Sequence, residues 1–308
     1  MIPGSANSLL MRPAAAAAAS EVVTKSCRFD GSSYLSQATG STATTWTMAF
    51  WVKRAKLGTL QYLLTFSTAS GLAINASDQL YFYNGTAYTS TSVYRDTGAW
   101  MHVAIVCTSG SADFYINGTQ VTDGSFSSSL TCAAVGTLNI GYWSFDSLYY
   151  YNGYMADFYF VEGSAVTPKN NFTNNPANDA NGQLKPKAYT SSLGTNGFHL
   201  EFLQDGVGTG SSSTIGADTG GGDNHFDSSG IAASDQMEDR PTNNYAVLNP
   251  LSLGSGGTLA EGNLELATSS SGYANCYSTI AMGEANDTKK YYAEFYVTVA
   301  SEAIIGMA

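Results

Sequence analysis

Five aromatic side chains fall within nine positions of this sequence and form its most prominent candidate for ligand binding. They are Trp143, Phe145, Tyr149, Tyr150 and Tyr151. Sugar rings stack on aromatic faces, and tyrosine hydroxyls can hydrogen-bond to sugar hydroxyls, so the cluster is a candidate carbohydrate-binding site. The alternative is that these rings pack at an edge of the fold or in a subunit interface, because buried aromatic residues outnumber exposed binding ones. Packing is the favoured interpretation, and a division of the rings between both roles is allowed.

The histidines do not form a compact catalytic motif. His102, His199 and His225 lie far apart in the sequence. A Ser-His-Asp set could still form from distant residues, but no G-x-S-x-G motif supports it. His102, two residues after Trp100, is interpreted as a strand residue with a satisfied hydrogen bond.

The four cysteines, Cys27, Cys107, Cys132 and Cys276, are widely spaced. They show no C-x-x-C spacing, so a zinc site is not predicted. Cys107 lies in an apolar, strand-like run, which favours a free buried thiol. Disulfide pairing stays open as the alternative.

The charge pattern argues against two classes of partner. Only 12% of the residues are charged, and the formal net charge is −11. A basic stripe for phosphate contacts is not visible, so nucleic-acid binding is not predicted. An acidic surface also fits poorly with anionic membranes, and no apolar stretch reaches the ~18 residues that a membrane span needs.

The first 22 residues are predicted to form an assembly arm. Arg12 follows the apolar Leu9, Leu10 and Met11 instead of preceding them, which is the wrong order for a secretory signal. Pro3 and Pro13 interrupt any helix before the run of alanines. A cleaved signal peptide is the alternative.

Alternation of apolar and polar residues predicts an all-β fold from Phe29 onward. In residues 46–53, Trp46, Met48, Phe50 and Val52 share one face, as in a strand inside a sandwich. Asn84-Gly85 and Asn117-Gly118 follow strand-like runs and predict hairpins with positive φ at both residues of each pair. Strands about every ten residues indicate an antiparallel sandwich or barrel, which a further strand at Phe198, Leu200 and Phe202 could close.

The rest of the chain divides into two parts. Residues 206–245 are rich in Gly, Ser, Thr and Asp and are predicted to be a loop or linker. Residues 291–299 alternate strongly and predict a strand, and residues 303–307 predict the next. Since two strands are too few for a stable sheet domain, they either join the first sandwich or begin a second one.

Five blocks in the first half resemble laminin-G-like jelly rolls of the concanavalin-like kind. They are residues 29–35, 46–53, 100–118, 138–141 and 153–158, in the expected order. The resemblance implies an antiparallel jelly-roll β-sandwich at residues 23–205. Such domains often bind calcium through Asp side chains at a loop rim, and the candidate donors are Asp96, Asp113, Asp123, Asp146 and Asp157. Of these, Asp96 and Asp146 are the residues assigned to a calcium site. A single Asp in a turn is usually there for the turn itself, and no EF-hand loop is present.

The same fold also hosts glucanases, which carry alternate carboxylates on one strand in a Glu-x-Asp-x-x-Glu pattern. Asp157 and Glu162 are five residues apart and fall on opposite faces of a strand. Glu201 and Asp205 could share a face but have no third partner nearby. The chain is therefore predicted not to be an enzyme.

A further resemblance is to structural proteins of tailed phages, particularly marine ones. It is carried by the opening residues Met1, Ile2, Pro3, Gly4, Ser5, Ala6 and Asn7 and by residues 241–250, PTNNYAVLNP. Residues 290–295 resemble the opening of a SPRY-like β-sandwich, so residues 246–308 are assigned to the incomplete start of one. The resemblance implies a tail fibre, head fibre or decoration protein.

These observations together predict a non-enzymatic structural protein on the exterior of a virion, with candidate binding to a host-surface glycan. The N-terminal arm is expected to attach it to other virion proteins, and the resemblance implies a homo-oligomer, commonly a trimer. The alternative is a secreted or surface carbohydrate-active enzyme or lectin of a bacterium.

Overall fold

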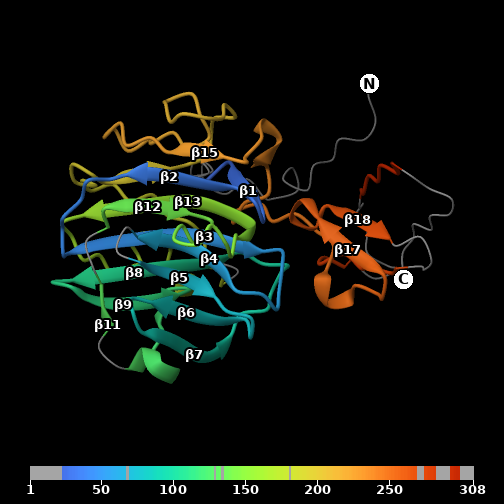
Figure 1. Cartoon of the computed structure of the whole chain (residues 1–308), viewed down its shortest axis with the longest axis horizontal. Coiled ribbons are helices and arrows are strands. Elements are labelled where there is room, and N and C mark those ends of the chain that lie inside the picture. Colours follow the sequence, from blue (N-terminus) through green and yellow to red (C-terminus); the bar gives the residue numbers. More distant parts are fainter. Residues whose placement is uncertain are drawn as a thin grey trace.

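The protein folds as a sandwich of two antiparallel sheets, as predicted (Figure 1). The computed structural model describes residues 23–66, 69–127, 130–132, 135–179, 182–268, 274–281 and 292–298. The nine-stranded sheet has the order β10 (Thr119–Gln120), β9 (Ser111–Ile116), β8 (Met101–Thr108), β3 (Trp46–Arg54), β13 (Asn152–Glu162), β1 (Ser26–Asp30) and β16 (Gln236–Met237), with β11 (Leu130–Thr131) beside β9 and β14 (Phe198–Leu200) beside β13. The seven-stranded sheet has the order β15 (Asp227–Ser229), β2 (Tyr34–Ala38), β12 (Thr137–Ile140), β4 (Gln61–Phe66), β5 (Ser70–Ile74), β6 (Gln79–Tyr83) and β7 (Ala87–Val93).

The remaining elements are short. A hairpin of β17 (Gly257–Ala260) and β18 (Glu265–Thr268) lies beside the sandwich in Figure 1. Single 3-10 turns occur at η2 (Gly124–Ser127), η3 (Pro176–Asn178), η4 (Ala233–Asp235), η5 (Pro250–Ser252) and η6 (Glu261–Asn263). In the described ranges, no helix has the length and apolar character needed to span a membrane.

Strand β3 explains how the sandwich is layered. Its alternate residues Trp46, Met48, Phe50 and Val52 point between the sheets and are fully buried in the main core. The opposite face is buried as well, because residues after β13 fold over it, with Phe172 in the cluster around Ala49 and Leu184 in the cluster around Trp51. A strand covered on both sides loses the polar alternation that marks a half-exposed strand, which explains the two apolar faces of its sequence.

The two Asn-Gly hairpins differ. Asn117 and Gly118 have φ values of 51° and 74° and join β9 to β10, as the sequence predicts. Between β6 and β7 the loop has three residues, 84–86, and of the Asn-Gly pair Gly85 alone has a positive φ, at 96°. The hairpin prediction is confirmed there, but the turn geometry is not.

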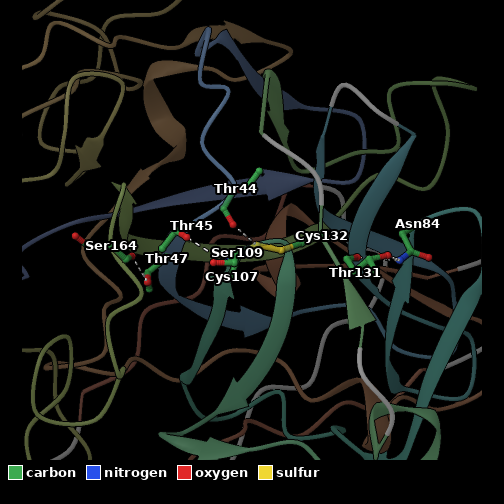
Figure 2. Close-up of a disulfide and its surroundings, with 9 residues drawn as sticks. All are labelled: Thr44, Thr45, Thr47, Asn84, Cys107, Ser109, Thr131, Cys132 and Ser164. Atoms are coloured by element: carbon green, nitrogen blue, oxygen red, sulfur yellow. Dashed lines mark hydrogen bonds between the residues drawn. A yellow bond between two sulfur atoms is a disulfide. The ribbon is translucent and has the colours of Figure 1, made fainter.

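Cys107 forms a disulfide with Cys132, so the prediction of a free buried thiol is wrong (Figure 2). The short strand β11 pairs with β9, which pairs with β8, and this arrangement brings Cys132 close to Cys107 on β8. Asn84 Nδ2 donates to the carbonyl oxygen of Thr131 at 2.9 Å, which links the same segment to the β6–β7 hairpin (Figure 2). The 25-residue separation hides this proximity from sequence inspection.

The predicted linker, residues 206–245, packs against the sandwich instead of standing apart from it. It adds β15 to one sheet and β16 to the other, and three of its apolar residues, Ile215, Phe226 and Ile231, join the main core. The glycine-rich part is held by Asp218, whose carboxylate accepts hydrogen bonds from backbone N–H groups of residues 199, 220, 222 and 224 at 2.7–3.2 Å. A few apolar side chains are enough to order this segment, because they enter a core that other residues already form.

Lys53 fastens residues 239–245 to the outer part of the nine-stranded sheet. Its ammonium group is fully buried and lies 2.7 Å from Asp239 Oδ2, Asn244 Oδ1 and the carbonyl oxygen of Tyr245. Trp100 Nε1 donates to the other oxygen of Asp239 at 2.9 Å. The conspicuous sequence at residues 241–250 therefore makes structural contacts with the jelly roll.

The C-terminal residues do not show the predicted strand. Residues 292–298 contain no strand, and Tyr292 and Tyr296 are 85% and 90% exposed. A strand needs a pairing partner, and none of the described residues supplies one. The second predicted strand, at 303–307, and the arm at residues 1–22 with its proposed attachment residues lie outside the described residues.

Candidate functional site

The five aromatic residues that the sequence singled out are divided between core and surface. Tyr151 is 1% exposed and donates its hydroxyl to the carbonyl oxygen of Lys53 at 2.9 Å, so it is a core residue. Trp143 is 8% exposed and packs against Tyr62, with ring centroids 4.5 Å apart. Phe145 and Tyr149 are 47% and 43% exposed. The loop between β12 and β13 therefore presents some rings to solvent and buries others.

The exposed rings belong to a larger aromatic surface on the outer face of the seven-stranded sheet, which we call the aromatic platform. Its members come from strands β2, β4 and β6 and from the β12–β13 loop. They form two groups of contacting rings, one of Tyr34, Tyr142 and Tyr150 and the other of Tyr62, Tyr81, Tyr83, Trp143, Phe145 and Tyr149. On β6, Tyr81 and Tyr83 alternate with the buried Leu80 and Phe82. That alternation was the available signal for their outward position.

Burial favours the protonated form of two tyrosines of the platform, Tyr62 and Tyr142. Burial, with a smaller effect of Tyr34, raises the pKa of Tyr142 to about 12. Burial, followed by the neighbouring Tyr81, also raises the pKa of Tyr62 well above its usual value. Protonated hydroxyls can both donate and accept hydrogen bonds, as a surface that binds sugar hydroxyls requires.

The predicted calcium donors do not converge. Asp96 Oδ1 accepts a hydrogen bond from the backbone N–H of Gly98 at 2.8 Å, which is the turn role expected of a lone Asp. The carboxylate of Asp123 accepts from the edge of β7, at Thr91 and Ser92. Within the described part of the chain, no group of three or more His, Cys, Asp or Glu residues is arranged to hold a metal ion, and Asp146 belongs to no such group. A calcium site formed by Asp96 or Asp146 together with carbonyl oxygens stays a prediction.

His102 lies on β8, as predicted, but its side chain is not satisfied by hydrogen bonds. It is 1% exposed, its Nδ1 has no partner among the described residues, and its ring meets Trp51 edge-on at 5.1 Å. Burial lowers the pKa of His102 to about 3. It is therefore a neutral packing residue.

His199 and Asp157 do come together, although they are 42 residues apart. His199 Nε2 lies 2.8 Å from Asp157 Oδ1, and Thr219 Oγ1 lies 3.4 Å from His199 Nδ1. Thr219 Oγ1 also donates to the carbonyl oxygen of His199 at 3.1 Å, so its hydrogen is not directed at the imidazole. Asp157 and Glu162 each have a separate partner, His199 and Asn196, so they do not act as a pair.

Comparison with known proteins shows what part of the chain is similar to. Residues 29–170 match the family model described as the concanavalin A-like lectin/glucanases superfamily, in agreement with the resemblance of these residues to laminin-G-like jelly rolls. No curated protein matches the chain. The family description includes lectins and glucanases, and the fold is therefore compatible with both binding and hydrolysis.

The chain is also similar to several solved structures. A putative carbohydrate-binding protein from Bacteroides ovatus is 16% identical over 68% of this chain and 59% of that one, with a TM-score of 0.49. The SAP-like pentraxin of Limulus polyphemus is 15% identical over 48% of this chain and 80% of that one, with a TM-score of 0.37. Domain 4 of AbnA, an extracellular arabinanase from Geobacillus stearothermophilus solved with arabinotriose, is 17% identical over 42% of this chain and 66% of that one, with a TM-score of 0.32. This chain spans about three fifths of the Bacteroides protein.

Proposed function

We propose that this protein is a non-enzymatic, carbohydrate-binding structural protein of a virus particle, and that the aromatic platform is its glycan-binding surface. The observation that carries the binding role is the platform itself, where Phe145 and Tyr149 expose nearly half of their surface beside further tyrosines. Flat aromatic faces with hydroxyl groups at their edges suit the apolar face and the hydroxyls of a sugar ring.

The particle role is supported by the sequence resemblance to tailed-phage structural proteins at residues 1–7 and 241–250. We propose that the N-terminal arm docks onto other virion proteins and that the sandwich is displayed on the exterior of the particle as a homo-oligomer, a trimer by resemblance. Weak binding at each site would then be strengthened by the number of copies displayed. Within residues 241–250, Asn244 and Tyr245 bind Lys53 and so attach this segment to the jelly roll.

The platform predicts a specific loss of glycan binding. The double substitution Phe145→Ala/Tyr149→Ala is expected to weaken binding to neutral polysaccharides such as dextran, mannan or xylan by about tenfold, the equivalent of ~1.4 kcal/mol. The measurement is retention on immobilised polysaccharide together with adsorption to host cells. Substitution is preferable to deletion of the loop, because Trp143 and Tyr151 in the same segment are buried.

Tyr277→Ala is the matched control, since Tyr277 is 58% exposed and belongs to the segment that pairs with Leu248, away from the platform. It is expected to bind like the parent protein. Equal retention of all three proteins would refute the platform as the binding surface. Release of reducing sugar from any of these polysaccharides would overturn the non-enzymatic assignment.

The particle role has its own test. Mass spectrometry of gradient-banded virions is expected to find this polypeptide in a fixed ratio to the other particle proteins. Its absence from virions and accumulation in the culture medium would contradict the proposal.

One observation favours a second candidate, a secreted or surface lectin of a bacterium. The Cys107–Cys132 disulfide is typical of proteins that fold in oxidising compartments. Alkylation of free thiols in protein taken directly from the producing cells separates the two candidates. A protected Cys107–Cys132 pair within an oxidising compartment supports the lectin, whereas two reactive thiols in cytoplasmic protein support assembly inside the host cell.

A further inference from the structure

A polar cavity of about 700 Å³ lies on the outer face of the nine-stranded sheet, whereas the aromatic platform lies on the outer face of the other sheet. One wall is the segment that covers the sheet, and the other is the glycine-rich loop held by Asp218. Its lining consists of Tyr159, Tyr189, Thr190, Ser191, Ser192, Leu193, Gly194, Thr195, His199, Thr219, Gly220, Gly221 and Gly222. Pockets for small molecules typically have volumes of about 300–1,000 Å³.

His199 is fixed at the base of this cavity. Its ring stacks on Tyr159, with centroids 3.8 Å apart and planes 9° from parallel, and its Nε2 is bound to Asp157. Strand β13 has a bulge between Ala156 and Tyr159, and Asp157 within it has a φ of +53°. Bulges re-aim side chains, and a non-glycine residue at positive φ is a strained arrangement that needs support from its surroundings. Here that arrangement places the buried Asp157 carboxyl against His199.

The hydrogen bond to Asp157 determines what His199 offers to the cavity. Because Nε2 is engaged with Asp157 Oδ1, Nδ1 is the imidazole nitrogen left for a second partner, and the tautomer of the ring decides whether it donates or accepts. The side of the ring that carries Nδ1 faces Thr219, a cavity residue, 3.4 Å from its hydroxyl oxygen. A hydroxyl group of a ligand that entered beside Thr219 could therefore hydrogen-bond with Nδ1, because a hydroxyl both donates and accepts.

The lining also selects the class of ligand. It has no Lys or Arg to attract an anion and no Asp or Glu to attract a cation. Thr190, Ser191, Ser192 and Thr195 are exposed and contribute hydroxyls, whereas Tyr189 and Leu193 contribute apolar surface. Hydroxyl donors and acceptors around a small apolar surface are suited to a neutral sugar.

The glycine-rich wall of the cavity packs closely against Leu193 on the opposite wall. A Cβ added at Gly220 would lie 2.4 Å from Leu193 Cδ1, so a larger residue would displace the Leu193 side chain on the opposite wall. The same glycine donates its N–H to Asp218 at 2.7 Å. The shape of the cavity is thus built by specific residues on both walls.

We propose that this cavity is a second sugar site, which binds one or two neutral sugar units with His199 Nδ1 as a hydrogen-bonding partner and Asp157 as its positioning residue. The residues that support this second site are different from those of the platform, although both sites would serve carbohydrate recognition. A short chain end or a free saccharide suits the cavity, whereas an extended polysaccharide suits the flat platform.

The test monitors the imidazole nitrogens of His199 by NMR while glucose, galactose or N-acetylglucosamine is added to roughly 50 mM, well above a millimolar Kd. At least one sugar is expected to shift the His199 Nδ1 resonance and to receive saturation transfer from the protein. Ser192→Trp, which fills the entrance from an exposed position, is expected to weaken this binding by about tenfold or more, equivalent to ~1.4 kcal/mol. Asp157→Asn is expected to change the tautomer population of His199, a readout that a merely structural role would leave unchanged.

Ser77→Trp places the same bulky side chain at an exposed turn away from the cavity and is expected to bind the sugar like the parent protein. Phe145→Ala/Tyr149→Ala is expected to keep the His199 response even where it loses polysaccharide binding, and Ser192→Trp is expected to show the reverse. No shift at His199 with any of the three sugars, or an equal response in the Ser192→Trp protein, would overturn the second site while leaving the platform unaffected.

Discussion

Replacing Lys53 with methionine is expected to destabilise the fold by about 3–5 kcal/mol, the usual cost of leaving one partner of a buried ion pair alone. The methionine would fill most of the same space, but the carboxylate of Asp239, itself 4% exposed, would lose its cation. Asn244 and Tyr245 would lose a common donor at the same time. The free energy of unfolding, measured in urea for the parent and the Lys53→Met protein, checks this expectation.

Two further proteins make the Lys53 experiment specific. Lys53→Met/Asp239→Asn also removes the unpaired carboxylate and is expected to recover a large part of the lost stability, because neutral side chains of similar shape replace the ion pair. Lys25→Met removes a cation from an ion pair with the exposed Glu238 and is expected to cost no more than about 1 kcal/mol. If Lys25→Met were as damaging as Lys53→Met, burial would not be the reason for the effect.

Lowering the pH from 7 to 4.5 is expected to cost about 2–3 kcal/mol of stability through His102 alone. The folded pKa of about 3 lies below the value of 6.5 for an exposed histidine. Between these two values the unfolded chain binds a proton that the folded chain does not. The stabilising contribution is therefore fully present above pH 6.5 and is lost as the pH falls toward 3.

His102→Phe keeps a ring against Trp51 and removes the proton-binding group. Its unfolding free energy is expected to change less between pH 7 and 4.5 than that of the parent, by the same ~2–3 kcal/mol. Chemical denaturation at several pH values measures this difference. Parallel profiles for the two proteins would show that His102 does not contribute to acid sensitivity.

The sandwich itself could be predicted because its signal is local. Alternating residues such as Trp46, Met48 and Phe50 in β3 report a buried face directly, and they all enter the main core. The disulfide could not be predicted in the same way, since Cys132 reaches Cys107 through the pairing of two intervening strands. Likewise, residues 206–245 have the composition of a linker, and their order comes from a core built by other residues.

The candidate sites show the same limit. The cluster at residues 143–151 indicates the correct region of the surface, but its sequence does not reveal that Tyr151 turns into the core. Nothing in the sequence links His199 to Asp157, because their contact depends on a bulge in β13 that leaves no clear sequence pattern. The sequence shows which residue types are present and how they are spaced, and the three-dimensional fold decides which of them come into contact.

The placement of β15 and β16 has a consequence for how the chain matures. β15 pairs with β2, and β16 pairs with β1, with Gln236 opposite Cys27. One edge of each sheet is therefore covered only after more than two hundred residues have been synthesised. Until then, β1 and β2 present open backbone groups of the kind that recruit strands from other molecules. A shortened version that ends near residue 205 would keep those flanks open and is therefore a candidate for self-association, even though it contains most of the jelly roll.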